Sequence, residues 1–349
     1  MTVLAAPRLV DIGVIVSMLA DRVPALCAEL LPAGAREGHH WRIGNLAGEP
    51  GRSMGVNLAT GLWRDWGDGE KGGDALDLVA KVLFRGDKRR AIQWARAWLG
   101  LDSADPASFE QHRREVVKRR EHAERDDMRR QRLAAGIFLA AQAQLAGTPA
   151  AVYLASRAID LAQLGRQPRS LRFHPALWNE ESQRHWPALV AAIVNLNGRI
   201  VAAHRTWLRE DGSSKAPLRD PKMTLGRYVG GSIRLWRGAS GKALKDASAD
   251  DMLVVTEGIE DGLSVAVAAP EYRVIAAVSL SNMHNIALPP AVGIITIMAQ
   301  NDAPDSPAAA ALDCAVEHFA GLGKRVRIAR PPPEVKDAND LLRAGAGAA

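Results

Sequence analysis

Cysteine is almost absent from this sequence. Only two of the 349 residues are cysteines, Cys27 and Cys314, and they lie far apart in the chain. Two cysteines provide neither a disulfide framework nor a four-cysteine zinc site. We therefore expect a cytoplasmic protein without a disulfide scaffold.

Long apolar runs are missing as well. Hydrophobic residues make up 47% of the chain, but no run approaches the roughly 18 residues that a membrane helix needs. The mildly apolar residues 1–16 contain Asp11, and no small-residue cleavage site follows them. We expect no membrane span, no signal peptide and no membrane partner.

A complete phosphate-binding P loop is the third absence. The segment Gly238-Ala-Ser-Gly-Lys242-Ala243 resembles one, but Trp236 stands where the first glycine is required, and neither serine nor threonine follows the lysine. The sequence therefore predicts no ATPase or helicase motor.

The chain is long enough for two or three domains, and it is modestly basic, with a net charge of +6. Arginine greatly outnumbers lysine, which suits bidentate contacts with phosphate. A GC-rich genome produces the same bias. The charge is therefore compatible with a nucleic-acid partner without identifying one.

Residues 1–100 have the pattern of a compact α+β unit. Apolar spacing predicts a helix over residues 14–31, and glycine-separated segments predict strands at 40–43, 53–58 and 61–66. Helices are expected over residues 75–83, capped by Asp74, and over residues 88–99.

Tryptophan and arginine alternate along the expected strands of this unit. Trp41 precedes Arg42, and Trp63 precedes Arg64. Such a sheet can stack bases and hold phosphates. The alternative is that the tryptophans form the core of a small domain. Residues 101–147 then begin with a linker signature and continue as a charge-dense helix, either an exposed connector or a nucleic-acid contact.

A basic hairpin is predicted in residues 148–248. The apolar strand at residues 188–194 is followed by Asn197-Gly198 and a second strand at 199–206, which is a strong hairpin signal. Four cations lie on or beside it: Arg199, Arg205, Lys215 and Lys222. They could hold phosphates beside an acidic metal site, or they could be scattered surface charge.

Acidic residues follow two predicted strands in the last third of the chain. Strands at residues 253–256, 273–278, 294–299 and 325–329 alternate with helices at about 259–269, 306–321 and 339–344, which indicates a parallel sheet. Glu257 follows the first strand and Asp302 follows the third. Ligands bind at such carboxyl ends of strands.

Several of these segments together resemble the DNA primase family of phages, plasmids and mobile elements. Thr256-Glu257-Gly258 and Gln300-Asn301-Asp302 resemble the topoisomerase–primase (Toprim) fold, and so does the tail Lys336-Asp-Ala-Asn-Asp340. Arg157, in Tyr153-Leu-Ala-Ser-Arg157, and the basic hairpin resemble the lobe that precedes Toprim in primases. Gly72-Gly-Asp-Ala-Leu-Asp-Leu-Val79 resembles the end of a primase zinc-binding domain.

The resemblance implies a multi-domain α/β and α+β protein. Residues 1–100 would be a degenerate zinc-binding-like domain, 101–147 a charged helical linker, 148–248 the basic lobe of a primase core and 249–349 a Toprim domain with a parallel sheet flanked by helices. Catalysis is expected from Glu257, Asp302, Lys222 and Arg205. Mg²⁺ or Mn²⁺ would be held by Glu257, Asp302, Asp261 and Asp305. Substrate or nucleic acid would be bound by Arg157, Arg199, Lys215, Trp41, Arg42, Trp63 and Arg64.

Two departures from the family pattern matter. Only Cys27, His39 and His40 are available as zinc ligands in the first domain, too few for a structural site, so no zinc is expected. Gln300 replaces the first acid of an Asp-x-Asp pair, and a neutral amide is a weak ligand for a hard cation. One cation remains compatible with the acids that are left, whereas two-metal chemistry is in doubt.

Three functions follow from the resemblance. The first is a primase-like nucleotidyltransferase that makes short primers on single-stranded DNA from nucleoside triphosphates, with a helicase acting in trans. The second is a non-catalytic DNA-binding accessory or regulator derived from a primase, and the third is a Toprim nuclease. Topoisomerase activity is not expected, because none of the three tyrosines has a nucleophile context.

Overall fold

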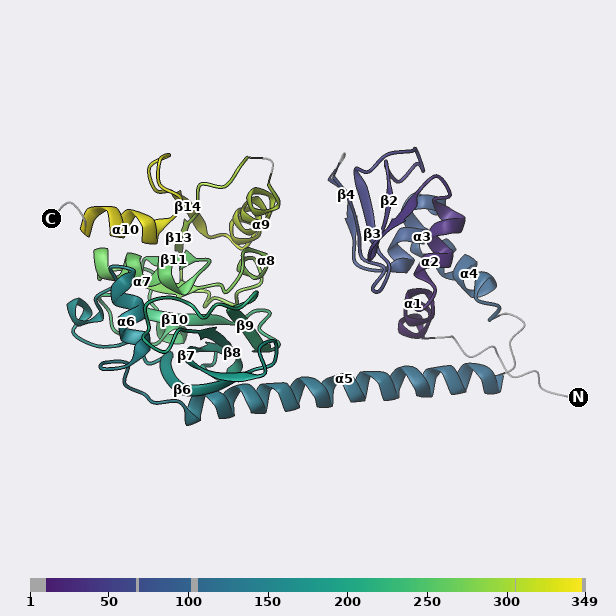
Figure 1. The fold of residues 1–349 in the computed structure, drawn as a ribbon. Helices are drawn as coiled ribbons and strands as arrows, with labels where there is room; N and C mark the ends of the chain where they lie inside the picture. The colour runs from purple at the N-terminus through teal and green to yellow at the C-terminus, as the bar shows by residue number, and fades with distance from the viewer. Residues whose placement is uncertain (1–10, 67–68, 102–105, 305, 347–349) are drawn as a thin grey trace, which may run out of the picture. The chain divides into compact units, whose positions relative to one another are not determined.

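The computed structural model describes residues 11–66, 69–101, 106–304 and 306–346 (Figure 1). The chain divides into two compact units between Glu124 and Arg125, and each unit is described by itself. No helix in the described part is long and apolar enough to cross a membrane.

Four short helices cover one face of the sheet in the first unit. They are α1 (Ile12–Ala20), α2 (Val23–Leu30), α3 (Ala75–Phe84) and α4 (Lys88–Trp98). The single helix predicted over residues 14–31 is wrong, because the helix ends at Asp21 and a new one begins with Pro24 in its first turn, where the missing N–H of proline is tolerated. Asp74 caps α3 as predicted, since its carboxylate accepts the N–H of Asp77 at 2.8 Å.

The described strands of the first unit form a five-stranded antiparallel meander. They are β1 (Ala35–Glu37), β2 (His40–Ile43), β3 (Met54–Asn57), β4 (Trp63–Asp65) and β5 (Lys71–Gly72). The register aligns Trp41, Val56 and Trp63 across β2, β3 and β4 on the face that packs on the helices. Because side chains alternate along a strand, Arg42 and Arg64 lie on the opposite face.

Helix α5 (Pro106–Ala140) is 35 residues long. It confirms the predicted helical character of the charge-dense segment. Its C-terminal turns belong to the second unit, where Ala134 and Phe138 pack in an apolar cluster with Val190 and Trp207.

One mixed sheet runs through the whole of the second unit. Nine described strands form it, in the order β14-β13-β11-β12-β10-β7-β8-β9, with β6 paired to β7. Their bounds are β6 (Leu171–Asn179), β7 (Arg184–Val194), β8 (Ile200–Trp207), β9 (Lys222–Gly226), β10 (Ser232–Arg237), β11 (Leu253–Thr256), β12 (Arg273–Ala276), β13 (Ile294–Met298) and β14 (Arg325–Ala329).

The two halves of this sheet differ in strand direction. The predicted hairpin is present as β7 and β8, and the four predicted C-terminal strands pair in parallel as β11 to β14. Strand β10, which was not predicted, pairs antiparallel with both β7 and β12 and thereby joins the halves. The predicted class, a mixed α/β protein with a Toprim-like C-terminal sheet and an N-terminal antiparallel sheet, is confirmed.

Helices cover both faces of the C-terminal half. Helix α7 (Ile259–Ala268) shares an apolar cluster with Val254 and Val274 on one face. On the other face α8 (Leu280–Met283) and α9 (Pro307–Gly321) pack with Val255 and Ile275. The remaining helical elements of the unit are α6 (Pro149–Ser156), η1 (Leu161–Leu164), η2 (Leu244–Asp246) and α10 (Ala338–Ala346).

Candidate active site

A cleft of about 330 Å³ opens where the two halves of the second unit's sheet meet. Basic side chains from the N-terminal half and acidic side chains from the C-terminal half line it together. Its charged and polar lining residues are Arg157, His204, Lys215, Lys222, Glu257, Glu260, Asp261, Gln300, Asp337 and Asn339.

Glu257 lies at the carboxyl end of β11, where the strand turns into α7. It is partly buried and accepts the backbone N–H of Leu280. Burial raises the pKa of its carboxyl group, and the negative charges of Asp302 and Asp261 raise it further. The acids that the sequence assigned to one metal site therefore act on one another through their charges.

Helix α7 approaches the sheet closely because residue 262 is a glycine. A Cβ at Gly262 would collide with the side chains of Leu235 and Thr256. This approach brings the first turn of α7, with Glu260 and Asp261, to the wall of the cleft.

Gln300 hydrogen-bonds to Asp261, on the first turn of α7. Its amide Nε2 donates to Asp261 Oδ2 at 3.1 Å, and the backbone N–H of Asn339 donates to Asp261 Oδ1 at 3.2 Å. Burial, followed by the charge of Asp337, raises the pKa of Asp261 to about 6. A glutamine at position 300 thus stabilises a buried acid that would otherwise face another negative charge.

Glu260 is the centre of the basic wall. Its Oε1 lies 3.0 Å from Lys222 Nζ and 3.7 Å from Lys215 Nζ, and it accepts the hydroxyl of Tyr153 at 2.8 Å. Burial opposes ionisation, but the charges of Lys222 and Lys215 outweigh it and lower the pKa of Glu260 to about 2. The acid is therefore ionised and holds both lysines at the cleft.

Two basic groups of this wall have lowered pKa values. Burial lowers the pKa of Lys215 to about 8 although the charge of Glu260 acts in the opposite direction. Burial, then the charge of Lys222, lowers the pKa of His204 to about 4. His204 is neutral at pH 7, and its Nδ1 lies 3.2 Å from the hydroxyl of Thr224 on β9.

Asn339, at the start of α10, joins three parts of the site. Its side-chain amide donates to the carbonyl of Arg157 at 2.9 Å and to the hydroxyl of Ser264 at 3.0 Å, while its backbone binds Asp261. The guanidinium of Arg157 lies over the ring of Tyr153, 5.7 Å from its centroid. This network fixes Arg157 at the edge of the cleft.

The structure brings some of the predicted site residues to the cleft and leaves others elsewhere. Lys215, Lys222, Glu257, Asp261 and Arg157 line it, and Asp302 is close enough for its charge to act on Glu257. Asp305 lies outside the described residues.

Arg205 and Arg199 do not line the cleft. Arg205 stacks over Trp207, 4.9 Å from its ring centroid, on the face of the sheet opposite His204 because neighbouring residues of a strand alternate. Arg199 is exposed in the turn between β7 and β8.

The four predicted residues of the first unit lie on two faces. Trp63 is only 3% exposed, and Trp41 packs against the core and donates its indole N–H to the carbonyl of Leu31 at 3.1 Å. Trp41 and Trp63 are therefore part of the core, which was the alternative interpretation of these tryptophans. Arg42 lies over the exposed Trp66, 5.2 Å from its ring centroid, and Arg64 is exposed on the same face.

Glu257 and Asp302 are the described acids that could hold a divalent cation. Glu257 and Asp302 offer the oxygen ligands that Mg²⁺ prefers, and Mg²⁺ uses one or two carboxylates together with water and phosphate oxygens. A cation would also relieve the repulsion that raises the pKa of Glu257. Asp261 already accepts two protein hydrogen bonds, and among the described side chains no three of His, Cys, Asp or Glu are grouped to hold a metal.

Sequence reasoning missed Glu260, Tyr153, His204 and Asn339 as parts of the site. Asn339 stands in the Lys-Asp-x-Asn-Asp tail, which was a usable signal. No sequence signal pointed to Glu260, because its hydrogen-bond partner Tyr153 lies 107 residues away from it in the chain.

Two family matches cover parts of the chain. Residues 252–348 match the Toprim domain, which confirms the predicted C-terminal Toprim domain. Residues 128–235 match a domain of unknown function, DUF7146. No curated protein sequence matches the chain.

Several solved structures have a similar fold. A DNA primase domain from Pseudomonas aeruginosa is 17% identical, with 62% of this chain and 74% of that chain covered and a TM-score of 0.41. The DnaG primase catalytic domain bound to single-stranded DNA is 18% identical, with 63% and 76% covered and a TM-score of 0.44. The primase fragment of the bacteriophage T7 primase-helicase protein is 20% identical, with 56% and 69% covered and a TM-score of 0.36.

The Toprim match supports the predicted resemblance to primase-type proteins with a C-terminal Toprim domain. Because all three TM-scores are below 0.5, no residue role is carried over from these structures to this chain.

Proposed function

We propose that the chain is a primase-like nucleotidyltransferase that makes short primers on single-stranded DNA for the replication of a phage or mobile element. The observation that carries the proposal is the cleft of the second unit, where Glu257 and its neighbouring acids face Lys215 and Lys222. Phosphoryl transfer needs both groups, cations for the triphosphate and acids for a metal ion.

The lysines of the basic wall would hold the triphosphate. Glu260 keeps Lys222 and Lys215 at the cleft, so their ammonium groups are oriented before a substrate arrives. Such preorganisation is the main way in which proteins stabilise the charge that develops at a transferring phosphorus. Arg157, whose backbone carbonyl accepts from Asn339 and whose guanidinium lies over Tyr153, would contact the same substrate.

Glu257 and Asp302 would hold one Mg²⁺ or Mn²⁺. When bound, the cation supplies charge neutralisation at the phosphate oxygens. Asp261 remains bonded to Gln300 and Asn339 and would shape the pocket without binding the ion.

The exposed face of the first unit's sheet would bind the template strand. Arg42, Trp66, Arg64 and Lys71 share this face, and a Cβ at Gly55 between them would meet Arg42 and the ring of Trp66. Stacking on an exposed tryptophan with cations beside it binds single strands without sequence preference. We infer that a replicative helicase supplies the separated strand.

A specific observation favours a second candidate function, a non-catalytic DNA-binding accessory. Gln300 replaces an acid and is hydrogen-bonded to Asp261, the residue that could otherwise have been a third metal ligand. In this alternative the cleft would bind nucleotide or strand without transferring it.

Primer synthesis from labelled nucleoside triphosphates on single-stranded DNA, with Mg²⁺ or Mn²⁺, decides between the two. We expect product from the unaltered protein and at least a hundredfold less from Glu257→Ala, with Glu317→Ala, on the exposed face of α9, as the matched control. Equal background in all three proteins alongside intact strand binding would establish the accessory. Shortening of a labelled strand would instead reveal a nuclease.

A further inference from the structure

A second and larger cavity lies in the same unit, away from the acidic cleft. Its volume is about 710 Å³, within the range of small-molecule sites. Ile233 lines the cleft, whereas Arg234, the next residue of β10, lines this cavity. Because successive side chains of a strand point to opposite faces, the cavity opens on the other face of the sheet.

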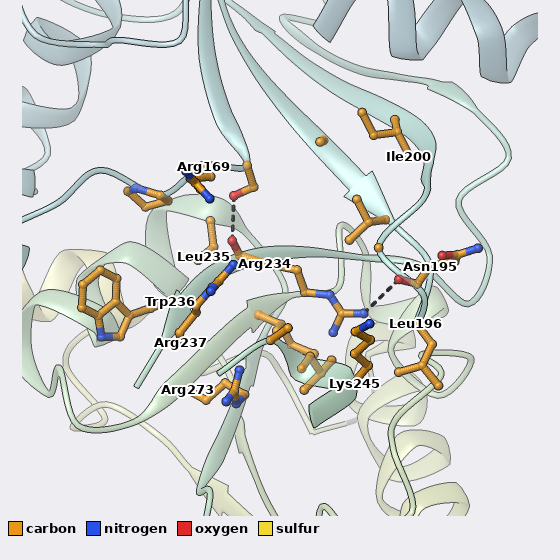
Figure 2. Close-up of a pocket in the computed structure, with 18 of the residues that line it drawn as sticks. Arg169, Asn195, Leu196, Ile200, Arg234, Leu235, Trp236, Arg237, Lys245 and Arg273 are labelled. Atoms are coloured by element: carbon orange, nitrogen blue, oxygen red, sulfur yellow. Dashed lines mark hydrogen bonds between the residues drawn. The ribbon is translucent and has the colours of Figure 1, made fainter. Parts of the chain in front are cut away.

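The wall of the cavity is basic. Six cations line it: Arg166, Arg169, Arg234, Arg237, Lys245 and Arg273. They come from the segment before β6, from β10, from η2 and from β12 (Figure 2). Of the lining residues that the structure describes, none is an aspartate or a glutamate.

Two arginines at the cavity have buried N–H groups without a partner. The Nη1 of Arg234 and the Nε of Arg273 are buried and form no hydrogen bond among the described residues. Arg273 is only 3% exposed, and its other guanidinium nitrogens donate to Asp251 at 2.8 Å, to the hydroxyl of Ser240 at 3.0 Å and to the carbonyl of Lys242 at 2.9 Å. Arg234 reaches only the carbonyl of Asn195, at 3.4 Å (Figure 2), and no described carboxylate lies within ion-pair distance of it.

Arg234 carries a largely buried positive charge that no described carboxylate compensates. Burial, followed by the charge of Arg273, lowers the pKa of Arg234 to about 10. A buried cation is stable only with a compensating charge, and guanidinium groups bind phosphate with paired, charge-assisted hydrogen bonds.

The other lining residues suit a nucleoside. Apolar side chains of Phe138, Val194 and Leu244 line the same cavity, and Trp236 presents an indole whose ring already carries Arg166, 4.9 Å from its centroid. Cavities with apolar walls and a few convergent polar groups are typical of nucleotide-sized ligands.

We propose that this cavity binds a nucleoside polyphosphate, with Arg234 and Arg273 at the phosphates and the apolar wall at the base. A terminal phosphate can enter a recess with buried N–H groups, whereas the phosphodiesters of a continuous strand contact cations at the surface. The site is separate from the candidate active site and does not depend on the proposed primer synthesis.

Calorimetric titration of the full chain in EDTA tests the proposal, with ATP, inorganic tripolyphosphate and oligo(dT) as separate ligands. The Lys222→Gln variant removes the contribution of the cleft. In this background we expect ATP still to bind, and the added change Arg234→Gln to weaken it about ten- to a hundredfold, the effect of losing one hydrogen bond to a charged group. The Arg169→Gln/Arg237→Gln variant, which changes exposed side chains, is expected to weaken it as well, with Arg327→Gln on β14 as the unaffected control.

Three outcomes would overturn the site. One is ATP binding that is absent, or equal in all variants. Another is binding lost in Lys222→Gln and kept in Arg234→Gln, which would place ATP in the cleft. The third is weaker oligo(dT) binding in the arginine variants with ATP binding unchanged, which would assign the cavity to a strand. Tripolyphosphate binding as tightly as ATP would remove the nucleoside from the proposal.

Discussion

Glu260 is the residue on which the basic wall of the cleft depends. Its Oε1 lies within ion-pair distance of Lys222 and Lys215 and accepts the hydroxyl of Tyr153. Its low pKa of about 2 shows that the lysines outweigh its burial. We therefore propose that Glu260 positions the lysines and that the lysines contact the phosphates.

Glu260→Gln is expected to lower the free energy of unfolding by about 1–3 kcal/mol. Breaking one side of a buried ion pair costs more than this, but Lys222 and Lys215 are partly exposed, so solvent screens the loss. Urea denaturation measures the change, and Glu317→Gln, on an exposed part of α9, is the matched control. A variant as stable as the unaltered protein would show that Glu260 does not hold the lysines.

The lowered pKa of Lys215 predicts how triphosphate binding depends on pH. With a pKa of about 8, its side chain is about nine-tenths charged at pH 7 and about one-tenth charged at pH 9. Raising the pH over this interval removes a positive charge, so the affinity for triphosphate is expected to fall. Lys215→Arg stays charged across the interval and is expected to bind with little pH dependence. Equal pH profiles for the two proteins would exclude Lys215 as a phosphate ligand.

Gln300→Asp is expected to lower the stability of the protein without metal and to strengthen the binding of Mg²⁺. Without metal, the new carboxylate loses the hydrogen bond to Asp261 and repels it, which lowers stability by about 1–3 kcal/mol. With Mg²⁺, it adds a ligand and raises metal affinity. Thermal unfolding with and without Mg²⁺ measures both effects, and Gln300→Ala, which loses the bond without adding charge, is the control. A destabilisation that Mg²⁺ does not reduce would contradict the position of the site.

At the scale of elements, the two faces of the first unit's sheet carry different side chains. Trp63 and Trp41 face the helices, while Trp66, Arg42 and Arg64 face away from them.

Trp66→Ala is expected to weaken single-strand binding by about 1–3 kcal/mol with little loss of stability, because the ring is half exposed. Trp63→Ala is expected to cost about 3–5 kcal/mol of stability. Fluorescence anisotropy and urea denaturation measure the two quantities, and unchanged binding in Trp66→Ala would move the template elsewhere.

Elements set by local sequence were the ones that could be predicted. The strands β11 to β14, the β7–β8 hairpin and the Asp74 cap all depend on neighbouring residues, and all are present. The break at Asp21 was missed because the apolar spacing continues across it. Strand β10 was missed although its position decides the fold, since its partners are β7 and β12 and no local pattern identifies them.

The location of the candidate site could be predicted from the sequence, but the residues that line it could be predicted only in part. Glu257 was found from its place after an apolar strand. Arg205 was grouped with Lys222, yet the register pairs Thr206 with Lys222, so Arg205 lies on the other face. The face of the sheet on which a side chain lies depends on which strands pair and in which register, and composition does not contain that information.

At the scale of the whole molecule, one sheet joins the basic and acidic halves of the second unit. Strand β10 pairs with the basic hairpin on one side and with the Toprim strands on the other. The cleft with Glu257 lies on one face of this sheet, and the arginine-lined cavity with Arg234 lies on the other. The proposed nucleotide chemistry and the proposed second nucleotide site would thereby be carried by the same structural unit.

A crystal structure of the chain soaked with Mn²⁺ and a non-hydrolysable nucleoside triphosphate tests the central claim most directly. We expect anomalous density for one Mn²⁺ bound by Glu257 and Asp302, with the triphosphate contacting Lys222 and Lys215. Glu257→Ala crystals are expected to lack this density. Mn²⁺ absent from the cleft of the unaltered protein, with the triphosphate bound elsewhere, would contradict the proposed metal site.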